Sequence, residues 1–125
     1  VRTTGTGTID INQWVGGSIQ NAVDAVENTG TGLNTIHVGE GTFYENVSVY
    51  EDNFLLRGAN YGISPVTGVR GPESTVDGGL TGDSFNVTGN NVTIDGFNIV
   101  TDSNGVEVNG SENVTISHNI INTYS

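Results

Sequence analysis

The residues of this chain best suited to chemistry are aspartates that stand beside glycines in short polar turns. Asp77 and Asp83 flank the segment Gly-Gly-Leu-Thr-Gly, and Asp95 and Asp102 stand near later turns. Two such carboxylates with main-chain carbonyls could hold calcium, which takes about six to eight oxygen ligands. Turn formation alone also favours Asp-Gly pairs, and acid–base catalysis needs two acids that converge in a cleft. The pattern favours turn-forming aspartates without a cofactor, and a calcium site is the alternative.

The histidines and tyrosines do not form an evident catalytic group. His37 and His118 are far apart in the sequence, and the alternation around them predicts that both point outward. A metal site needs more ligands than two isolated histidines, so we expect surface histidines. The absence of cysteine excludes disulfides and thiolate sites. The four tyrosines could form a sugar-stacking patch or pack against loops: Tyr44, Tyr50, Tyr61 and Tyr124. We therefore favour a chain without enzymatic activity and leave catalysis open.

Asparagines in Asn-X-Ser/Thr sequons make the chain a candidate glycoprotein. Strand parity predicts that every sequon asparagine points outward, as glycosylation requires. Asn-Val-Thr is also a recurring part of a sequence repeat, which would explain the sequons without glycosylation. Asn91 and Asn113 would moreover stack too closely for both to carry glycans. The candidate acceptors are Asn46, Asn86, Asn91, Asn109 and Asn113.

Composition and charge narrow the class of protein. The chain has 14 acidic residues against three arginines and no lysine, which gives a net charge of −11. Nucleic acids and anionic membranes are bound through clustered Lys and Arg, so neither is expected as a partner. No stretch approaches the roughly 18 apolar residues of a membrane span. A hydrophobic content of 34% with 19 glycines is typical of a solenoid with a narrow core.

The elements that must position these residues begin with one helix. Ser18 is a favourable N-cap, and a glycine-rich stretch over 28–32 ends the helical pattern. We predict an amphipathic helix from Ser18 to Glu27, within a capping segment over 17–30, with Trp14 packed beneath it. Its apolar positions are Ile19, Ala22, Val23 and Val26.

After the helix the pattern alternates with period two, and it repeats. Residues 84–99 can be laid over 105–121 with an offset of 21 that becomes 22 near Ser111. Phe97 then falls on Asn119, which we expect to be a structural amide bonded to turn carbonyls. The apolar pairs that coincide are Phe85/Val106, Val87/Val108, Val92/Val114, Ile94/Ile116 and Ile99/Ile121.

Three short strands and three turns in 21 or 22 residues form one coil of a right-handed parallel β-helix. Stacked coils about 4.8 Å apart align matched residues in ladders, whereas an antiparallel sandwich gives no reason for such a repeat. We predict an all-β fold with one domain over 1–125 and coils over 35–125. Residues 59–74 contain both prolines and do not alternate, so we expect a protruding loop there, decorative or binding.

Several segments resemble the pectin-lyase-like β-helix superfamily. Residues 18–26, 35–47 and 54–58 resemble the opening of pectinesterases, and 91–97 and 113–119 resemble NosD-like coil repeats. The resemblance spans about 100 residues and implies the fold. The superfamily includes lyases, hydrolases, esterases and purely structural members. Its catalytic members use paired or clustered aspartates and an arginine on coils that have no match here, so no catalytic residue carries over.

The two ends of a solenoid need cover, because an open coil exposes strand edges and apolar core. The predicted helix covers one end, and the last coil ends in inward-facing Asn119 and Ile121. Either further coils or another copy covers them. Our leading hypothesis is a non-enzymatic extracellular or cell-surface unit of a filament, sheath or surface layer, assembling end to end through its coils. The alternatives are part of a carbohydrate-active enzyme, or a polysaccharide-binding adhesin module that uses the 59–74 loop.

Overall fold

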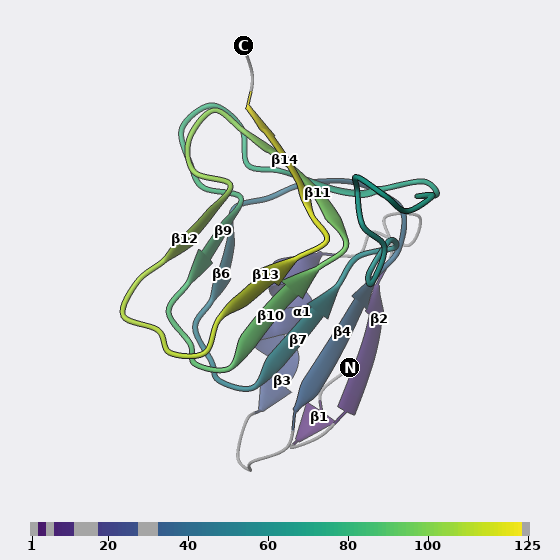
Figure 1. Cartoon of the computed structure of the whole chain (residues 1–125). Helices are drawn as coiled ribbons and strands as arrows, with labels where there is room; N and C mark the ends of the chain where they lie inside the picture. Colours follow the sequence, from purple (N-terminus) through teal and green to yellow (C-terminus); the bar gives the residue numbers. More distant parts are fainter. Residues whose placement is uncertain (1–2, 5–6, 12–17, 28–32, 124–125) are drawn as a thin grey trace.

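The computed structural model describes residues 3–4, 7–11, 18–27 and 33–123. Over these ranges the chain consists of short strands and one helix (Figure 1), and every strand pair is parallel. An antiparallel sandwich is therefore excluded for this part of the chain. Trp14, predicted to pack beneath the helix, and Tyr124, one of the four tyrosines of the predicted patch, lie outside the described residues.

From β4 onward the chain visits three sheets in a fixed rotation. The sheets have the orders β13-β10-β7-β4-β2, β14-β11-β8-β5 and β12-β9-β6. We call three consecutive strands, one in each sheet, a circuit. The first circuit is β4 (Asn34–Val38), β5 (Gly41–Tyr44) and β6 (Val47–Val49), and the second is β7 (Phe54–Arg57), β8 (Ser74–Asp77) and β9 (Phe85–Val87). The third is β10 (Val92–Asp95), β11 (Phe97–Thr101) and β12 (Val106–Val108), followed by β13 (Thr115–Ser117) and β14 (Ile120–Thr123).

The register between circuits confirms the ladders predicted from the repeat. Phe85 pairs with Val106, Val87 with Val108, Ile94 with Ile116 and Ile99 with Ile121. Thr93 pairs with Thr115, which places Val92 beside Val114 one residue earlier. The outward neighbours Asn86 and Glu107 pair as well.

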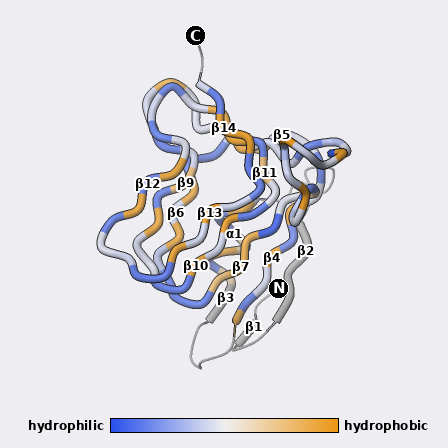
Figure 2. Tube along the Cα trace, viewed as in Figure 1, coloured by the Kyte–Doolittle hydropathy of each residue, from blue (hydrophilic) through white to orange (hydrophobic). Residues whose placement is uncertain are grey.

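The core lies between the three sheets and is filled by the inward residue of each alternating pair. Hydrophobic and hydrophilic residues alternate along the strands in Figure 2, and the inward ones are buried. Phe85 and Phe97 meet edge to face with ring centroids 5.5 Å apart. The largest buried side chains are Phe54, Phe85, Phe97, Ile19, Ile36, Leu56, Ile94 and Ile99. Since each strand contributes one or two such residues, a low hydrophobic content is enough to fill the core.

Polar side chains close the corners between the sheets. Asn53, Asn91 and Asn113 all have left-handed backbone angles, with φ of 64°, 56° and 59°. Asn53 and Asn91 stand immediately before β7 and β10, and Asn113 stands two residues before β13. Asparagine tolerates this conformation better than most residues. The side chain of Asp52 accepts a hydrogen bond from the Asn90 N–H in the next circuit, over 2.8 Å. Similar turns in successive circuits therefore bond to one another.

The helix is shorter than predicted. α1 runs from Ile19 to Ala25, seven residues, and Val26–Glu27 forms strand β3 instead. β3 pairs in parallel with β1 (Thr3–Thr4), so pairing with a distant segment overrides the helical pattern at Val26. Ser18 is the N-cap of α1, as predicted, since its Oγ accepts a hydrogen bond from the Asn21 N–H at 3.2 Å. Of the predicted capping segment over 17–30, residues 17 and 28–30 lie outside the described part.

α1 covers the edge of β6 that lies away from β9. Ile19, Ala22 and Val23 are buried in the core. Gln20 accepts a hydrogen bond from the Ser48 N–H (2.7 Å) and donates one to the Ser48 carbonyl (3.1 Å). One side-chain amide thus pairs with both polar groups of an edge residue, as a neighbouring strand would. In the five-stranded sheet, β2 (Gly7–Ile11) adds a further strand beyond β4.

Glu45 joins the helix to the turn between β5 and β6. Its carboxylate accepts hydrogen bonds from the N–H groups of Ile19 (2.9 Å) and Gln20 (3.0 Å) and from the Ser18 hydroxyl (3.1 Å). These amides belong to the first turn, whose N–H groups have no partner within the helix. A seven-residue helix, too short to be stable alone, is held in place in this way.

We predict that Gln20→Leu lowers the free energy of unfolding by about 1 kcal/mol, because both polar groups of Ser48 lose a partner while the side-chain volume is kept. Urea denaturation followed by circular dichroism measures the change. Asn21→Leu is the matched control, because Asn21 is the exposed neighbour on the same helix. Equal stability of the two variants would show that the amide of Gln20 does not protect the edge.

Candidate functional site

The C-terminal face of the described structure is apolar and uncovered. β12, β13 and β14 are the last strands of their sheets. Val108, Ile116 and Ile121 are 41%, 42% and 50% exposed, although their partners Val87, Ile94 and Ile99 in the preceding circuit are fully buried. Val106 and Val114 are partly buried against the core. We define the C-terminal face as the inward-facing residues on or directly beside the last strand of each sheet, β12, β13 and β14: Val106, Val108, Val114, Ile116 and Ile121.

Asn119 fixes the turn between β13 and β14 at the margin of this face. Its Nδ2 donates to the carbonyl of Ile94 (2.9 Å), and its Oδ1 accepts a hydrogen bond from the Phe97 N–H (2.8 Å). The expectation of a structural amide that bonds turn groups is confirmed. Of the two residues predicted for the assembly end, Asn119 braces the turn, whereas Ile121 presents apolar surface.

The segment predicted as a protruding loop, 59–74, falls between β7, which ends at Arg57, and β8, whose first residue is Ser74. Val66 and Val69 at its tip are 88% and 93% exposed. Asn60 is buried at the base of the loop and holds it closed by donating to the Gly71 carbonyl and accepting from the Gly71 N–H (3.1 and 2.9 Å). The loop is therefore anchored at its base and apolar at its tip.

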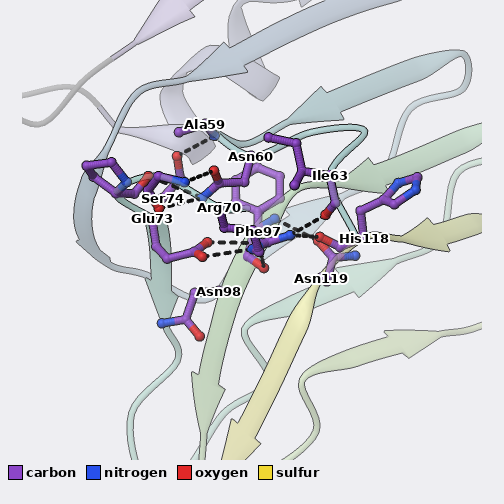
Figure 3. A network of polar contacts seen from close by, with 12 residues as sticks. Ala59, Asn60, Ile63, Arg70, Glu73, Ser74, Phe97, Asn98, His118 and Asn119 are labelled. Atoms are coloured by element: carbon purple, nitrogen blue, oxygen red, sulfur yellow. Dashed lines mark hydrogen bonds and ion pairs between the residues drawn. The ribbon is translucent and has the colours of Figure 1, made fainter. Parts of the chain in front are cut away.

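Arg70 connects the loop to the last circuit (Figure 3). Its guanidinium makes two hydrogen bonds to the carboxylate of Glu73, both 2.9 Å, and donates to the carbonyls of Ile63 (2.7 Å) and His118 (2.8 Å). A further, longer contact of 3.4 Å reaches the Phe97 carbonyl. The side chain of Arg70 is only 8% exposed. The single arginine of the loop therefore has a structural role, and these contacts leave none of its N–H groups free for a ligand.

The contact with Arg70 lowers the pKa of the Glu73 carboxyl group. Hydrogen bonds from Arg70 hold the pKa of Glu73 below its ordinary value of 4.5, although partial burial acts in the opposite direction. A depressed pKa means that the ionised pair stabilises the fold at pH values above 4.5. That contribution is lost as the pH falls through the pKa of the folded state.

A row of polar residues crosses the outward face of the five-stranded sheet. His37, Arg57 and Asp95 are register neighbours on β4, β7 and β10. Tyr61 covers the row, with the Arg57 guanidinium 4.7 Å from its ring centroid and the His37 ring 5.7 Å away. Sequence reasoning missed this cluster, because its members are separated by an inserted loop. Only the shared place of each residue near the end of its strand could have indicated it.

The second histidine belongs to the same surface. His118 lies with Nδ1 3.1 Å from Oδ1 of Asp95, which also accepts a hydrogen bond from the Gly62 N–H (2.9 Å). Oδ2 of Asp95 accepts one from the Ser117 hydroxyl (3.2 Å). Asp95 therefore ties the loop to the last circuit, and the two histidines are surface residues at different points of one row.

The remaining turn aspartates make local bonds. Asp77 accepts a hydrogen bond from the Gly79 N–H (2.9 Å), and Asp83 accepts bonds from Ser103 and Asn104 of the next circuit. Asp102 is exposed. The pKa of Asp83 is lowered, first by its hydrogen bond with Glu107 and further by those from Asn104 and Ser103. In the described part of the chain, no three histidine, aspartate or glutamate side chains converge as a metal site would require.

A cleft of about 300 Å³ lies over the turns between the second and third sheets. Tyr44 at its margin is 79% exposed, but the carboxylate of Glu45 is occupied by the helix, and Asn46 donates to main-chain carbonyls. The cleft therefore presents an aromatic ring to a ligand, but it does not present the pair of carboxylates that acid–base catalysis would need. Its lining residues are Tyr44, Glu45, Asn46, Asp77, Gly78 and Gly79.

The five sequon asparagines differ in whether their side-chain amides are hydrogen-bonded or buried within the protein. Asn46 donates both amide hydrogens, to the carbonyls of Gly78 (2.7 Å) and Asp83 (2.8 Å). Asn91 donates to Oδ1 of Asn53 at 3.0 Å. Asn86 is half-buried between neighbouring strands. The Oδ1 of Asn86 has no hydrogen-bond partner, but it is buried. Among the five sequon asparagines, all of which lie in the described part of the chain, Asn109 and Asn113 are the two that are exposed and whose amides have no protein partner.

No family model, curated protein or solved structure matches the chain. The described residues contain no helix that is long and apolar enough to span a membrane. The resemblance to pectin-lyase-like proteins therefore stays a prediction from sequence.

We predict that Arg70→Met destabilises the folded chain by about 3 kcal/mol at neutral pH, because the partly buried Glu73 carboxylate loses its partner. Arg57→Met is the control and should cost no more than about 1 kcal/mol, since Arg57 contributes a cation–π contact with Tyr61. Urea titrations at a series of pH values provide the measurement. The deficit of the Arg70 variant should shrink as the pH falls below 4.5, and a deficit independent of pH would contradict the role of Glu73.

For glycosylation, we predict that folded protein secreted by a eukaryotic host carries glycans at Asn109 or Asn113 and none at Asn46. A glycan on Asn46 would replace one of the two hydrogen bonds of its amide. Mass spectrometry of glycopeptides measures the occupancy of each site. Substantial occupancy of Asn46 in folded protein would show that its hydrogen bonds do not decide acceptor choice.

Proposed function

We propose that each circuit is one coil of a right-handed parallel β-helix and that the chain is a non-enzymatic structural module. In this proposal the module belongs to an extracellular or cell-surface assembly and associates through its C-terminal face. The observation that carries the proposal is the exposure of Val108, Ile116 and Ile121 at positions that are fully buried in the preceding circuit.

The fixed rotation through three parallel sheets supports the β-helix. Successive strands of one circuit lie in different sheets, and equivalent strands of successive circuits pair in register. Crossover connections between parallel strands of one sheet are right-handed in nearly all proteins. The resemblance of the coil repeats to pectin-lyase-like proteins agrees with this hand.

The C-terminal face supports association by its chemistry. Covering a half-exposed aliphatic side chain contributes about 1 kcal/mol, so the three most exposed residues contribute about 3 kcal/mol on each copy, or about 6 kcal/mol for a contact between two such faces. Pairing of the outer strand edges adds to this, whereas association itself costs several kcal/mol. We therefore propose a weak contact, with a dissociation constant on the order of 0.1–1 mM.

We propose a second copy of this chain as the partner. Residues 106–123 carry two of the chain's 14 acidic residues, Glu107 and Glu112, so charge repulsion between two C-terminal faces is small for a molecule of net charge −11. The opposite end is less suited to pairing, because α1 occupies the free edge of β6. Contact between two C-terminal faces is therefore favoured over head-to-tail growth, and a longer filament would need displacement of α1.

The surface chemistry supports a location outside the cell. Strong negative charge and an absence of lysine favour solubility, and Asn109 and Asn113 are open to glycosylation. The exposed ring of Tyr44 at the margin of the cleft fits a polysaccharide as a further partner. An enzymatic role has no comparable support among the described residues.

We predict that the 125-residue chain associates reversibly at concentrations near about 1 mM, and more strongly as salt rises, because salt screens repulsion beyond about 10 Å. Sedimentation velocity over a concentration series at low and high salt measures this. Ile121→Asp should abolish association without unfolding the chain, since Ile121 is half-exposed at the edge of the core.

The control is Val69→Asp, which adds the same charge at the exposed loop tip and should leave association unchanged. Circular dichroism establishes that both variants are folded. A chain that stays monomeric at every concentration and salt level would overturn the assembly. Loss of association in both variants would show that net charge, and not the C-terminal face, governs it.

A further inference from the structure

Four junctions in the described chain place an aspartate or asparagine directly before glycine. They are Asp77-Gly78, Asp95-Gly96, Asn104-Gly105 and Asn109-Gly110. At such junctions the glycine nitrogen can attack the preceding side-chain carbonyl carbon and form a five-membered succinimide, because glycine presents no side chain that obstructs the approach. The reaction requires an amide N–H without a hydrogen bond and a side chain that is free to turn. The structure therefore determines which junction reacts.

Both aspartate junctions are blocked. The Gly78 N–H donates to the Val100 carbonyl at 2.8 Å, and the Gly96 N–H donates to the Ser117 carbonyl at 3.3 Å. The side chains are held as well, since Asp77 accepts a bond from Gly79 and the carboxylate of Asp95 has the three partners described above.

Asn104 is held by the preceding circuit. Its N–H donates to Oδ1 of Asp83 at 3.1 Å, and its side chain is also hydrogen-bonded to Asp83. Its carbonyl accepts a bond from the Ser84 N–H at 3.1 Å. Rotation of the amide toward the Gly105 nitrogen would break the contact with Asp83, so this junction is protected although its glycine is suitable.

Asn109 has no such restraint. It follows the edge strand β12 directly, and its side chain is exposed. Within the described residues, neither its amide nor the Gly110 N–H has a hydrogen-bond partner. Gly110 has a φ of +66°, and no atom lies within 4 Å of the position where a Cβ would stand. Both reacting groups are therefore free, and there is space around them.

We propose that Asn109 is a site of spontaneous deamidation in the folded protein. The Gly110 nitrogen loses its proton and bonds to Cγ of Asn109, the Cγ–Nδ2 bond breaks, and ammonia leaves. Water then opens the imide at either carbonyl and yields aspartate or isoaspartate. Both products add a negative charge next to the C-terminal face, and isoaspartate also lengthens the main chain by one methylene. A glycan on Nδ2 of Asn109 would oppose the reaction by replacing the free amide.

The test follows deamidation of the purified chain in mildly alkaline buffer. Cleavage after glutamate isolates Val108–Glu112, in which Asn109 is the only asparagine, and mass spectrometry detects replacement of the amide by a carboxylate. We expect Asn109 to react about ten-fold faster than Asn104, the factor that corresponds to loss of about one hydrogen bond. In urea the two rates should become similar, because the contact of Asn104 with Asp83 is lost.

Two variants make the assignment specific. Asn109→Gln should abolish the fast reaction, and Asn104→Gln should leave it unchanged. Equal rates for Asn104 and Asn109 in the folded chain, or a difference of the same size in urea, would overturn the proposal. This outcome is independent of the assembly, which is measured by sedimentation.

Discussion

In-register stacking of parallel strands, one strand spacing apart, is the constraint on which this structure depends. Each inward residue meets the equivalent residue of the neighbouring circuits, so the two side chains must pack against each other. Val87 over Val108 and Ile94 over Ile116 meet this condition with aliphatic side chains. Some pairs differ in size or polarity, as Phe54 does from Asn34 and Phe97 from Ser74. Where Phe97 meets Asn119, the mismatch is accommodated because the amide bonds to the backbone of the neighbouring circuit. The corners follow the same rule with repeated left-handed asparagines.

This constraint explains how much of the fold could be predicted. Ladders leave a repeat in the sequence, so the pairing of 84–99 with 105–121 predicted parallel sheets and the correct register. The end of α1 could not be predicted, because Val26 continues the helical pattern but pairs with a segment more than 20 residues away. For the candidate site, Ile121 was predicted from parity, since its exposure follows from its place in the last circuit. The row formed by His37, Arg57 and Asp95 was missed, because it depends on register across an insertion of unpredictable length.

The two ends of the described structure satisfy their strand edges in different ways. At the N-terminal end, the amide of Gln20 bonds to Ser48 and the carboxylate of Glu45 bonds to the first turn of α1. At the C-terminal end, polar contacts from Arg70 and Asn119 fix the shape of the last turn but leave its apolar residues uncovered. One end thus resembles a finished protein surface, and the other resembles the interior of a longer stack.

At the corner between the first two sheets, the length of the connecting segment differs between circuits, whereas the register of the strands it joins stays the same. β10 and β11 are joined there by Gly96 alone, whereas β7 and β8, one circuit earlier, are joined by residues 58–73. Both connections return the chain to the same register, because the strands on either side are fixed by their neighbours above and below. This corner is therefore a natural insertion point. A foreign peptide or small domain could replace the loop tip at Val66 and Val69, provided that Asn60 and Arg70 keep their contacts, and a stack of such circuits would display it at a defined spacing.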